Sequence, residues 1–332
     1  MKRWEMGIRA LAAVRNGAGK ELMQPTKHNF PAAFGAARAA AVPTWKEFAT
    51  QARDSTAEAG EPNAPAMHPG LKRSMAADTY FLAQPMYSKE ELDIKLAHRP
   101  PKGLRDKTAF TLVQTMRKLF DQFTGYKPQQ HMTEAHWIRR CLFLETVAGV
   151  PGMVAGMLRH MESLRRMKRD NGWIHTLLEE AENERMHLLT FMEIRQGGPL
   201  FRLAVLGAQG VFFNLFFLSY ILSPKICHRF VGYLEEEAVR TYTHLLHDID
   251  SGVLPDFVNR KVPDVALKYW QLPKTATMRD VVEVIRADEA CHSHVNHTFA
   301  SMKKTDKNPF NKHPVVPKDD FTRPPEGVSL QD

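Results

Sequence analysis

The sequence has little cysteine and no pattern typical of a nucleic-acid-binding module. Its 332 residues include only Cys141, Cys227 and Cys291, and none of them forms a CxxC pair. A secreted disulfide framework would need more cysteines, so we expect free thiols in a reducing compartment. The net charge is nevertheless +8. Because zinc-finger and RNA-recognition signatures are missing, an anionic membrane or a targeting segment explains this charge better than nucleic acid does.

The N-terminus has no long apolar stretch before a cleavage site, which a secretory signal requires. Basic residues outnumber acidic ones there, and the apolar residues between them can share one side of a helix. This pattern predicts a mitochondrial transit peptide over residues 1–25, with an ordinary frayed basic terminus as the alternative. Residues 26–105 show weak periodicity and are expected to form an extended arm. The tail 303–332 is rich in Lys, Pro and Asp and is expected to be flexible.

Residues 106–302 show helical periodicity and no strand patterns, so the predicted fold class is all-α. Residues 107–125 place apolar side chains at the i, i+3, i+4, i+7 spacing of an amphipathic helix. Further helices are predicted over 134–150, 154–169, 173–195, 203–222, 226–249 and 277–302. Three of these segments are followed by the helix-ending sequences Pro-Gly, Gly-Gly-Pro and Ser-Pro.

One short motif, Glu-x-x-His, occurs twice on the predicted helices. The pairs are Glu184 with His187 and Glu289 with His292. Residues three apart lie at neighbouring points of one helix face, so each carboxylate and imidazole can reach a single metal ion. A lone motif of this kind is a weak signal and also fits a solvated charged face. Two copies on separate helices indicate a paired metal site.

Two further glutamates complete the set of ligands, one from each remaining helix. Glu145 precedes the first motif among small and apolar neighbours, and Glu235 precedes the second. The order Glu, Glu-x-x-His, Glu, Glu-x-x-His predicts a ferritin-like four-helix bundle with a di-iron carboxylate centre. A carboxylate-rich site with two histidines suits iron or manganese better than structural zinc. His294 and His297 point away from this face and are expected at the surface.

Three residues beside the ligands are candidates for supporting roles. Metal-bound histidines usually donate their second N–H to a carboxylate or carbonyl. Asn183 and Asp288 each precede a ligand glutamate and can fill this role, with a polar helix surface as the alternative. Tyr242 lies two turns after Glu235 and points the same way. It could supply an electron or a proton, or it could be a buried tyrosine with a satisfied hydroxyl.

The segment 203–222 carries no charge and is long enough to cross a bilayer. The predicted metal site argues against such a span. Glu184 precedes the segment and Glu235 follows it, so a span would separate two ligands of one site by roughly 30 Å of hydrocarbon. We therefore expect this helix to lie in one leaflet, with helix 107–125 as a second membrane surface. Ordinary core or dimer contacts are the alternative.

Four segments around the ligands together resemble the signature sequences of the alternative oxidases, in order and over about residues 105–300. The resemblance implies a homodimer on the matrix side of the mitochondrial inner membrane, with two irons and bound ubiquinol, and is closest in character to the trypanosomatid members. The N-terminal arm would contact the partner subunit. The four segments are Leu144-Glu145-Thr146, Asn183-Glu184-Arg185-Met186-His187-Leu188, Leu234-Glu235-Glu236-Glu237-Ala238 and Arg286-Ala287-Asp288-Glu289-Ala290-x-His292.

Positions outside the ligand set also match the family pattern. By resemblance, Tyr242 is the tyrosine near the irons, and Tyr269 and Trp270 are a further aromatic pair. No cysteine precedes Cys141, so the regulatory thiol of the plant members is missing. The resemblance implies a quinol pocket formed by Arg117, Asp121, Arg140, Leu144, Glu237, Ala238 and Thr241.

The predicted activity is the cyanide-insensitive oxidation of ubiquinol by O₂, which is reduced to water without proton pumping. Near alternatives are a plastoquinol oxidase and a di-iron hydroxylase of quinone biosynthesis. A ferroxidase or iron-storage protein would use the same bundle, but the apolar segment 203–222 and the N-terminal pattern speak against it. A membrane-associated scaffold without catalysis is a further alternative, which bound iron would exclude.

Overall fold

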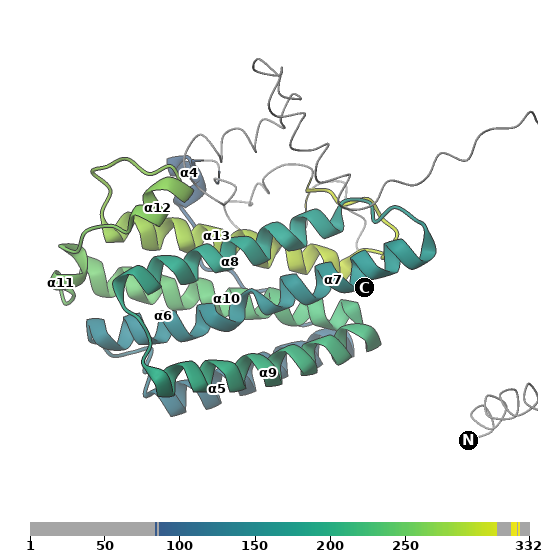
Figure 1. Ribbon diagram of the computed structural model, residues 1–332, viewed down its shortest axis with the longest axis horizontal. Coiled ribbons are helices and arrows are strands. Elements are labelled where there is room, and N and C mark those ends of the chain that lie inside the picture. The colour runs from purple at the N-terminus through teal and green to yellow at the C-terminus, as the bar shows by residue number, and fades with distance from the viewer. Residues whose placement is uncertain (1–83, 85, 311–319, 324, 326–332) are drawn as a thin grey trace, which may run out of the picture. The chain divides into compact units, whose positions relative to one another are not determined.

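The computed structural model describes residues 84, 86–310, 320–323 and 325, all within one compact unit that spans residues 67–332. These residues form helices and no strands, which confirms the all-α prediction (Figure 1). The predicted transit peptide and most of the predicted arm lie outside the described residues. The helices are α4 Lys89–Leu92, α5 Gly103–Thr124, α6 Glu134–Ala148, α7 Val150–Arg166, α8 Trp173–Ile194, α9 Pro199–Leu222, α10 Pro224–Asp250, α11 Pro255–Val258, α12 Asp264–Tyr269 and α13 Met278–Ser301.

Local sequence signals place the helix ends within a few residues of the predicted bounds. Pro199 and Pro224 occupy the first positions of α9 and α10, where the missing N–H of proline costs nothing. Gly125 ends α5 with a φ of 70°, a left-handed conformation that favours glycine. At the start of α13, Thr277 and Asp280 form a capping box.

Four long helices form the core in two packed pairs, α6 with α8 and α10 with α13 (Figure 1). Helix α7 lies against α8, and α5 lies against α10. The approach of α7 to α8 depends on Gly152, because a Cβ atom there would lie 2.7 Å from the Leu177 carbonyl oxygen. Buried aromatic and aliphatic side chains such as Trp137, Leu245 and Ile285 fill the space between the helices.

Helices α5 and α9 present an apolar surface that no described residue covers. In α9, Leu203, Leu206 and Leu218 are all more than half exposed, and Leu119 and Phe123 are so in α5. Two helical segments, 134–166 and 199–222, are long and apolar enough to cross a membrane by length and composition alone. The first segment comprises α6 and α7, and 44% of its most apolar 18 residues are buried. The second is α9, in which only 11% of the corresponding 18 residues are buried.

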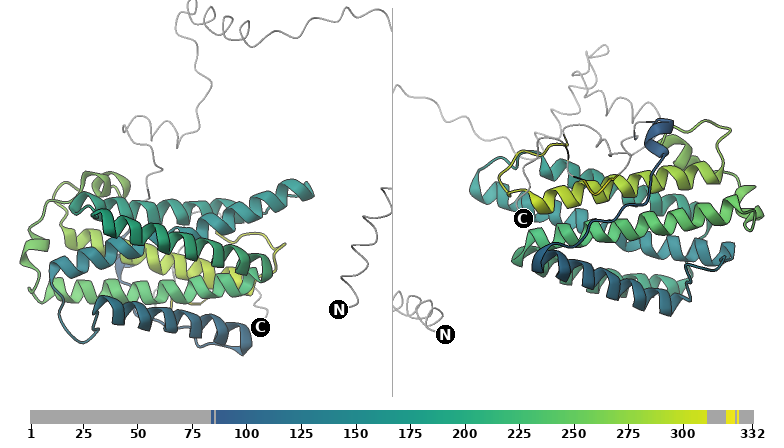
Figure 2. Two further views of the ribbon diagram at one scale, coloured as in Figure 1. Left: turned by 60° about the horizontal axis from the view of Figure 1, so that its bottom comes forward. Right: turned by 180° about the vertical axis from the view of Figure 1, so that it is seen from behind.

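The prediction that His294 and His297 lie at the surface is wrong, because each is only 1% exposed. The outer side of α13 is covered by the segment that follows α4 and by residues near the C-terminus (Figure 2). His294 contacts the carbonyl oxygen of Phe321, and Phe321 is itself buried. The described part of the tail that we expected to be flexible is therefore packed at this point.

Candidate metal centre

The structure brings the six predicted ligands together from four helices. Helix α6 supplies Glu145, α8 supplies Glu184 and His187, α10 supplies Glu235, and α13 supplies Glu289 and His292. All six residues are at most 6% exposed.

Distances between the ligand atoms show how compact the cluster is. One ligand atom each from Glu145, Glu184, His187 and Glu289 lies within 4.8 Å of the others. His292 Nδ1 lies 2.7 Å from a Glu184 carboxylate oxygen and 3.7 Å from one of Glu289.

Glu235 closes the cluster on the side of α10. It lines the same cavity as Glu145 and Glu289. Burial and the neighbouring carboxylates, with Glu289 the strongest of them, raise the pKa of Glu235 well above its usual range. The surrounding protein groups therefore favour the neutral form of the Glu235 carboxyl group.

Several buried polar atoms of the cluster lack a hydrogen-bond partner among the described residues. They include both carboxylate oxygens of Glu184, His187 Nδ1 and His292 Nδ1, because the 2.7 Å contact of His292 Nδ1 with Glu184 does not have the geometry of a hydrogen bond. Each such buried atom costs about 1–3 kcal/mol unless something satisfies it. Divalent cations would satisfy all of these atoms at once, and four carboxylates with two imidazoles form a donor set that fits two of them.

Asp288 sets the orientation of His187. One carboxylate oxygen of Asp288 lies 3.1 Å from His187 Nε2 and also accepts hydrogen bonds from Asn183 and Trp270, at 3.0 and 2.8 Å. Burial alone would raise the pKa of Asp288, but the contact with His187, and after it the charge of His292 and a hydrogen bond from Tyr87, lower it. The ionised carboxylate makes Nε2 of His187 the donor and leaves the Nδ1 lone pair facing the cluster.

Two tyrosines extend this support. The hydroxyl of Tyr269 accepts a hydrogen bond from Asn183 at 3.0 Å. Tyr87 donates a hydrogen bond to the second oxygen of Asp288 and comes from the segment before α4, 201 residues away in the chain. Tyr87 was not predicted from the sequence, because it belongs to no motif and lies in the weakly periodic arm.

Tyr242 contacts the cluster and also lines a large cavity beside it. Its hydroxyl donates a hydrogen bond to Glu145, and it is 3% exposed. Burial, together with the charge of Glu145, raises the pKa of Tyr242 well above its usual range. The side chain is therefore a neutral phenol in direct contact with a candidate ligand.

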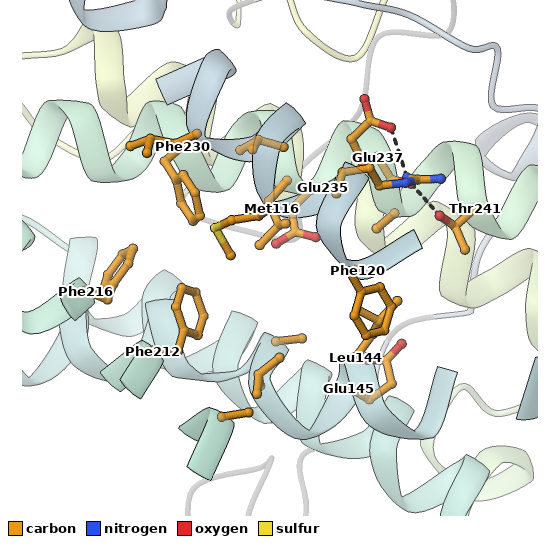
Figure 3. A pocket seen from close by; sticks show the side chains of 18 of the residues that line it. Met116, Phe120, Leu144, Glu145, Phe212, Phe216, Phe230, Glu235, Glu237 and Thr241 are labelled. Carbon is orange, nitrogen blue, oxygen red and sulfur yellow. Dashed lines mark hydrogen bonds and ion pairs between the residues drawn. The ribbon is translucent and has the colours of Figure 1, made fainter. Parts of the chain in front are cut away.

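The cavity beside the cluster has a volume of about 650 Å³ and is formed by α5, α6, α9, α10 and α13. Glu145, Glu235 and Glu289 line one part of it, and the aromatic rings of Phe120, Phe212, Phe216 and Phe230 line much of the rest (Figure 3). The residues predicted for the quinol pocket that line this cavity are Arg117, Arg140, Leu144, Glu237, Ala238 and Thr241.

A network of ion pairs forms the polar end of the cavity. Arg117 donates to Glu237 and to Asp121, in each case at 2.9 Å. Arg140 donates to the other oxygen of Asp121 at 2.5 Å, and its guanidinium lies 3.9 Å from the centre of the Tyr126 ring. Asp121 thus supports the two arginines and does not line the cavity. The stacking of Tyr126 was not predicted, because no helical periodicity covers the segment that carries it.

We predict that Glu184→Ala and His292→Ala each abolish most metal binding. Each change removes a donor from a cluster whose other buried atoms depend on a shared cation. Metal bound per chain should fall from about two to below one after loading with Fe²⁺ or Mn²⁺. Glu182→Ala, which removes the partly exposed partner of the exposed Arg185, is the matched control and should retain the metal. Full metal content in Glu184→Ala would refute the assignment.

The amino-acid sequence was compared with those of known proteins and protein families. Residues 87–301 match the family described as "Alternative oxidase". The chain is 55% identical over 241 residues to "Alternative oxidase, mitochondrial" of Ajellomyces capsulatus, with 68% of each chain covered. It is 56% identical over 240 residues to the protein of the same name from Emericella nidulans, with 69% of this chain and 68% of the relative covered. The corresponding protein of Yarrowia lipolytica is 50% identical over 237 residues, with 68% of this chain and 67% of the relative covered. The chain belongs to the alternative oxidase family.

Proposed function

We propose that this protein oxidises ubiquinol and reduces O₂ to water at a centre of two non-haem irons held by Glu145, Glu184, His187, Glu235, Glu289 and His292. The observation that carries the proposal is the direct opening of a buried carboxylate and histidine cluster into a large apolar cavity. The reaction balances as two ubiquinol and one O₂ giving two ubiquinone and two water. Relatives named "Alternative oxidase, mitochondrial" support this activity.

Iron suits the donor set, and when bound it supplies the redox chemistry that divides O₂ reduction into electron-transfer steps. The protein's own residues orient the ligands and place the groups around them. Asp288 keeps the His187 imidazole in one tautomer and orientation. The Tyr242 hydroxyl, which contacts Glu145, is placed to pass a proton or an electron between the cavity and the ligand cluster. Resistance to cyanide is part of the proposal.

The two parts of the cavity correspond to the two parts of a quinol. Its aromatic and aliphatic walls would hold the isoprenoid tail away from water. Its polar end would hold the hydroxyl groups of the head, with Arg140 as a donor and Glu237 as an acceptor. Glu237 is already oriented by Arg117, and by Gln114 at 2.8 Å. A substrate that pairs an apolar tail with a diphenol head therefore fits better than the hydrated Fe²⁺ of a ferroxidase.

The apolar surface of α5 and α9 would lie in one leaflet of the inner mitochondrial membrane, on the matrix side. Both helices also line the cavity, so a quinol could enter directly from the lipid. Helix α9 connects α8 to α10, and both of these helices contribute to the same buried cluster, which is incompatible with a bilayer between them. Without a span, the reaction would move no protons across the membrane.

The proposal keeps the remaining predictions. Residues 1–25 would be a transit peptide, and residues 26–105 would form an arm that contacts a second copy of the chain in a homodimer. The residues from 106 to 302 would form the catalytic unit, and the tail from 303 would be flexible beyond the buried positions described above. The likeness to trypanosomatid members also stays a prediction, because the relatives named above are fungal.

Iron-loaded protein should consume O₂ with ubiquinol as donor, in a 2:1 ratio, and millimolar cyanide should leave the rate unchanged. Arg140→Ala should lower kcat/KM for ubiquinol roughly 10–100-fold, because it removes a charge-assisted hydrogen bond worth about 1.5–3 kcal/mol. An oxygen electrode measures both quantities. A protein that oxidises Fe²⁺ but not ubiquinol would contradict the proposal.

Arg139→Ala is the matched control for Arg140. Arg139 is exposed, and among the described residues it donates only to the carbonyl oxygen of Ala135 within its own helix. The Arg139→Ala variant should leave kcat/KM for ubiquinol unchanged. The iron content of Arg139→Ala and Arg140→Ala should be equal.

We predict that charges on the apolar surface weaken membrane binding. Leu119→Glu and Leu218→Glu place carboxylates at exposed positions of α5 and α9, where insertion of a charge is unfavourable. Co-sedimentation with phosphatidylcholine and cardiolipin vesicles should fall about tenfold for each. Val253→Glu, an exposed apolar position after α10, is the control and should bind as the wild type does. Equal binding of all three variants would exclude the apolar surface of α5 and α9 as the membrane-binding surface.

A further inference from the structure

A second cluster of metal-binding side chains lies away from the di-iron site. It consists of His131, in the segment between α5 and α6, and of His247 and Asp248, near the end of α10. One donor atom from each of the three lies within 4.8 Å of the other two. Asp248 follows Glu235 by 13 positions on α10. At a rise of about 1.5 Å per residue, the two sites are roughly 20 Å apart along the helix.

Asp248 is fixed in place as a metal-binding carboxylate would be. It is fully buried, and one of its oxygens accepts hydrogen bonds from Trp137 Nε1 at 2.9 Å and from the Met132 amide at 3.0 Å. Burial opposes ionisation, but these two donors together with His131 lower the pKa of Asp248. The second oxygen faces the imidazoles. A ligand carboxylate is commonly held through its other oxygen in this way.

The two imidazoles approach that second oxygen from the solvent side. His131 Nδ1 lies 2.7 Å from it and His247 Nδ1 lies 3.9 Å from it, and the two rings are stacked within 6° of parallel. Bond lengths of about 2.0–2.1 Å around a tetrahedral Zn²⁺ place neighbouring donors about 3.3 Å apart. The two observed separations lie on either side of this value. Both imidazoles are more than half exposed, so small rotations of their side chains can adjust them.

We propose that His131, His247 and Asp248 bind one divalent cation of the Zn²⁺ class, with water completing the coordination. Two imidazoles and one carboxylate suit Zn²⁺ better than Mg²⁺ or Ca²⁺, which prefer oxygen ligands. The position in the last turn of α10 adds to the attraction, because the C-terminal end of a helix favours a cation. His244 also lies near the proposed site, with Nε2 3.6 Å from the Asp248 oxygen that faces the imidazoles. Its Nδ1 forms a hydrogen bond with the hydroxyl of Tyr126.

Binding would join α10, which lines the cavity, to the segment between α5 and α6. His131 belongs to the segment that also carries Tyr126, and the guanidinium of Arg140 packs on the Tyr126 ring. A cation shared with α10 would hold this segment against the helix. Since the ion would bind the folded chain and not the unfolded chain, it should also raise the midpoint of thermal unfolding.

The test measures Zn²⁺ binding to iron-loaded protein, in which the buried centre is already filled. Competition with a chromogenic chelator should show one Zn²⁺ per chain in addition to the iron, and Zn²⁺ should raise the unfolding midpoint. His131→Ala and His247→Ala should each weaken binding at least tenfold and remove that rise. His247→Ala changes an exposed side chain and should keep the wild-type midpoint without Zn²⁺. His131→Ala also loses the 2.7 Å hydrogen bond to Asp248 and should start from a lower midpoint, so the effect of Zn²⁺ is measured against each variant's own midpoint. Both variants should keep the wild-type iron content.

His175→Ala is the matched control, because His175 is an exposed histidine that also faces a carboxylate, that of Glu179 at 3.1 Å. It should bind Zn²⁺ as the wild type does. Three results would overturn the proposal. They are no Zn²⁺ bound beyond the iron centre, Zn²⁺ bound only as iron is released, and equal affinity in the wild type, His131→Ala and His247→Ala.

Discussion

Four carboxylates and two imidazoles buried in one small volume are the constraint on which the rest of the structure depends. Carboxylates at this separation repel one another, and burial deprives them of the water that would otherwise stabilise their charge. Bound cations remove both costs, so metal binding and the stability of the helical core are linked. The close packing of α6 with α8 and of α10 with α13 can be understood as the framework that keeps these ligands in place.

The residues that orient the ligands of the cluster come from distant parts of the chain. Asp288 receives hydrogen bonds from α8, from the residue after α12 and from Tyr87 in the segment before α4. One ionised carboxylate thus joins four parts of the fold and fixes His187. On the opposite side, Tyr242 joins Glu145 to the cavity wall. The donor set and the proposed substrate site are therefore adjacent, and the neutral phenol of Tyr242 lines the cavity next to Glu145.

The sequence allowed the helices and the assembly of the six candidate ligands to be predicted, because helical periodicity determines which residues share a face. The spacing of Glu184 with His187 and of Glu289 with His292 needed no knowledge of the tertiary fold. Contacts between segments without periodicity could not be predicted in this way. Tyr87 meets Asp288 across 201 positions, and His294 is buried because a segment near the C-terminus covers it. The resemblance to the alternative oxidases supplied the quinol-pocket residues, which spacing alone would not have indicated.

We propose that six side chains from four helices hold two irons at one end of an apolar cavity. Anomalous X-ray diffraction at the iron absorption edge, from crystals of iron-loaded protein, would locate these irons. We expect two strong peaks per chain, both within bonding distance of carboxylate or imidazole atoms of the six ligands. A single peak, or peaks bound by other residues, would show that the six side chains do not hold a di-iron centre.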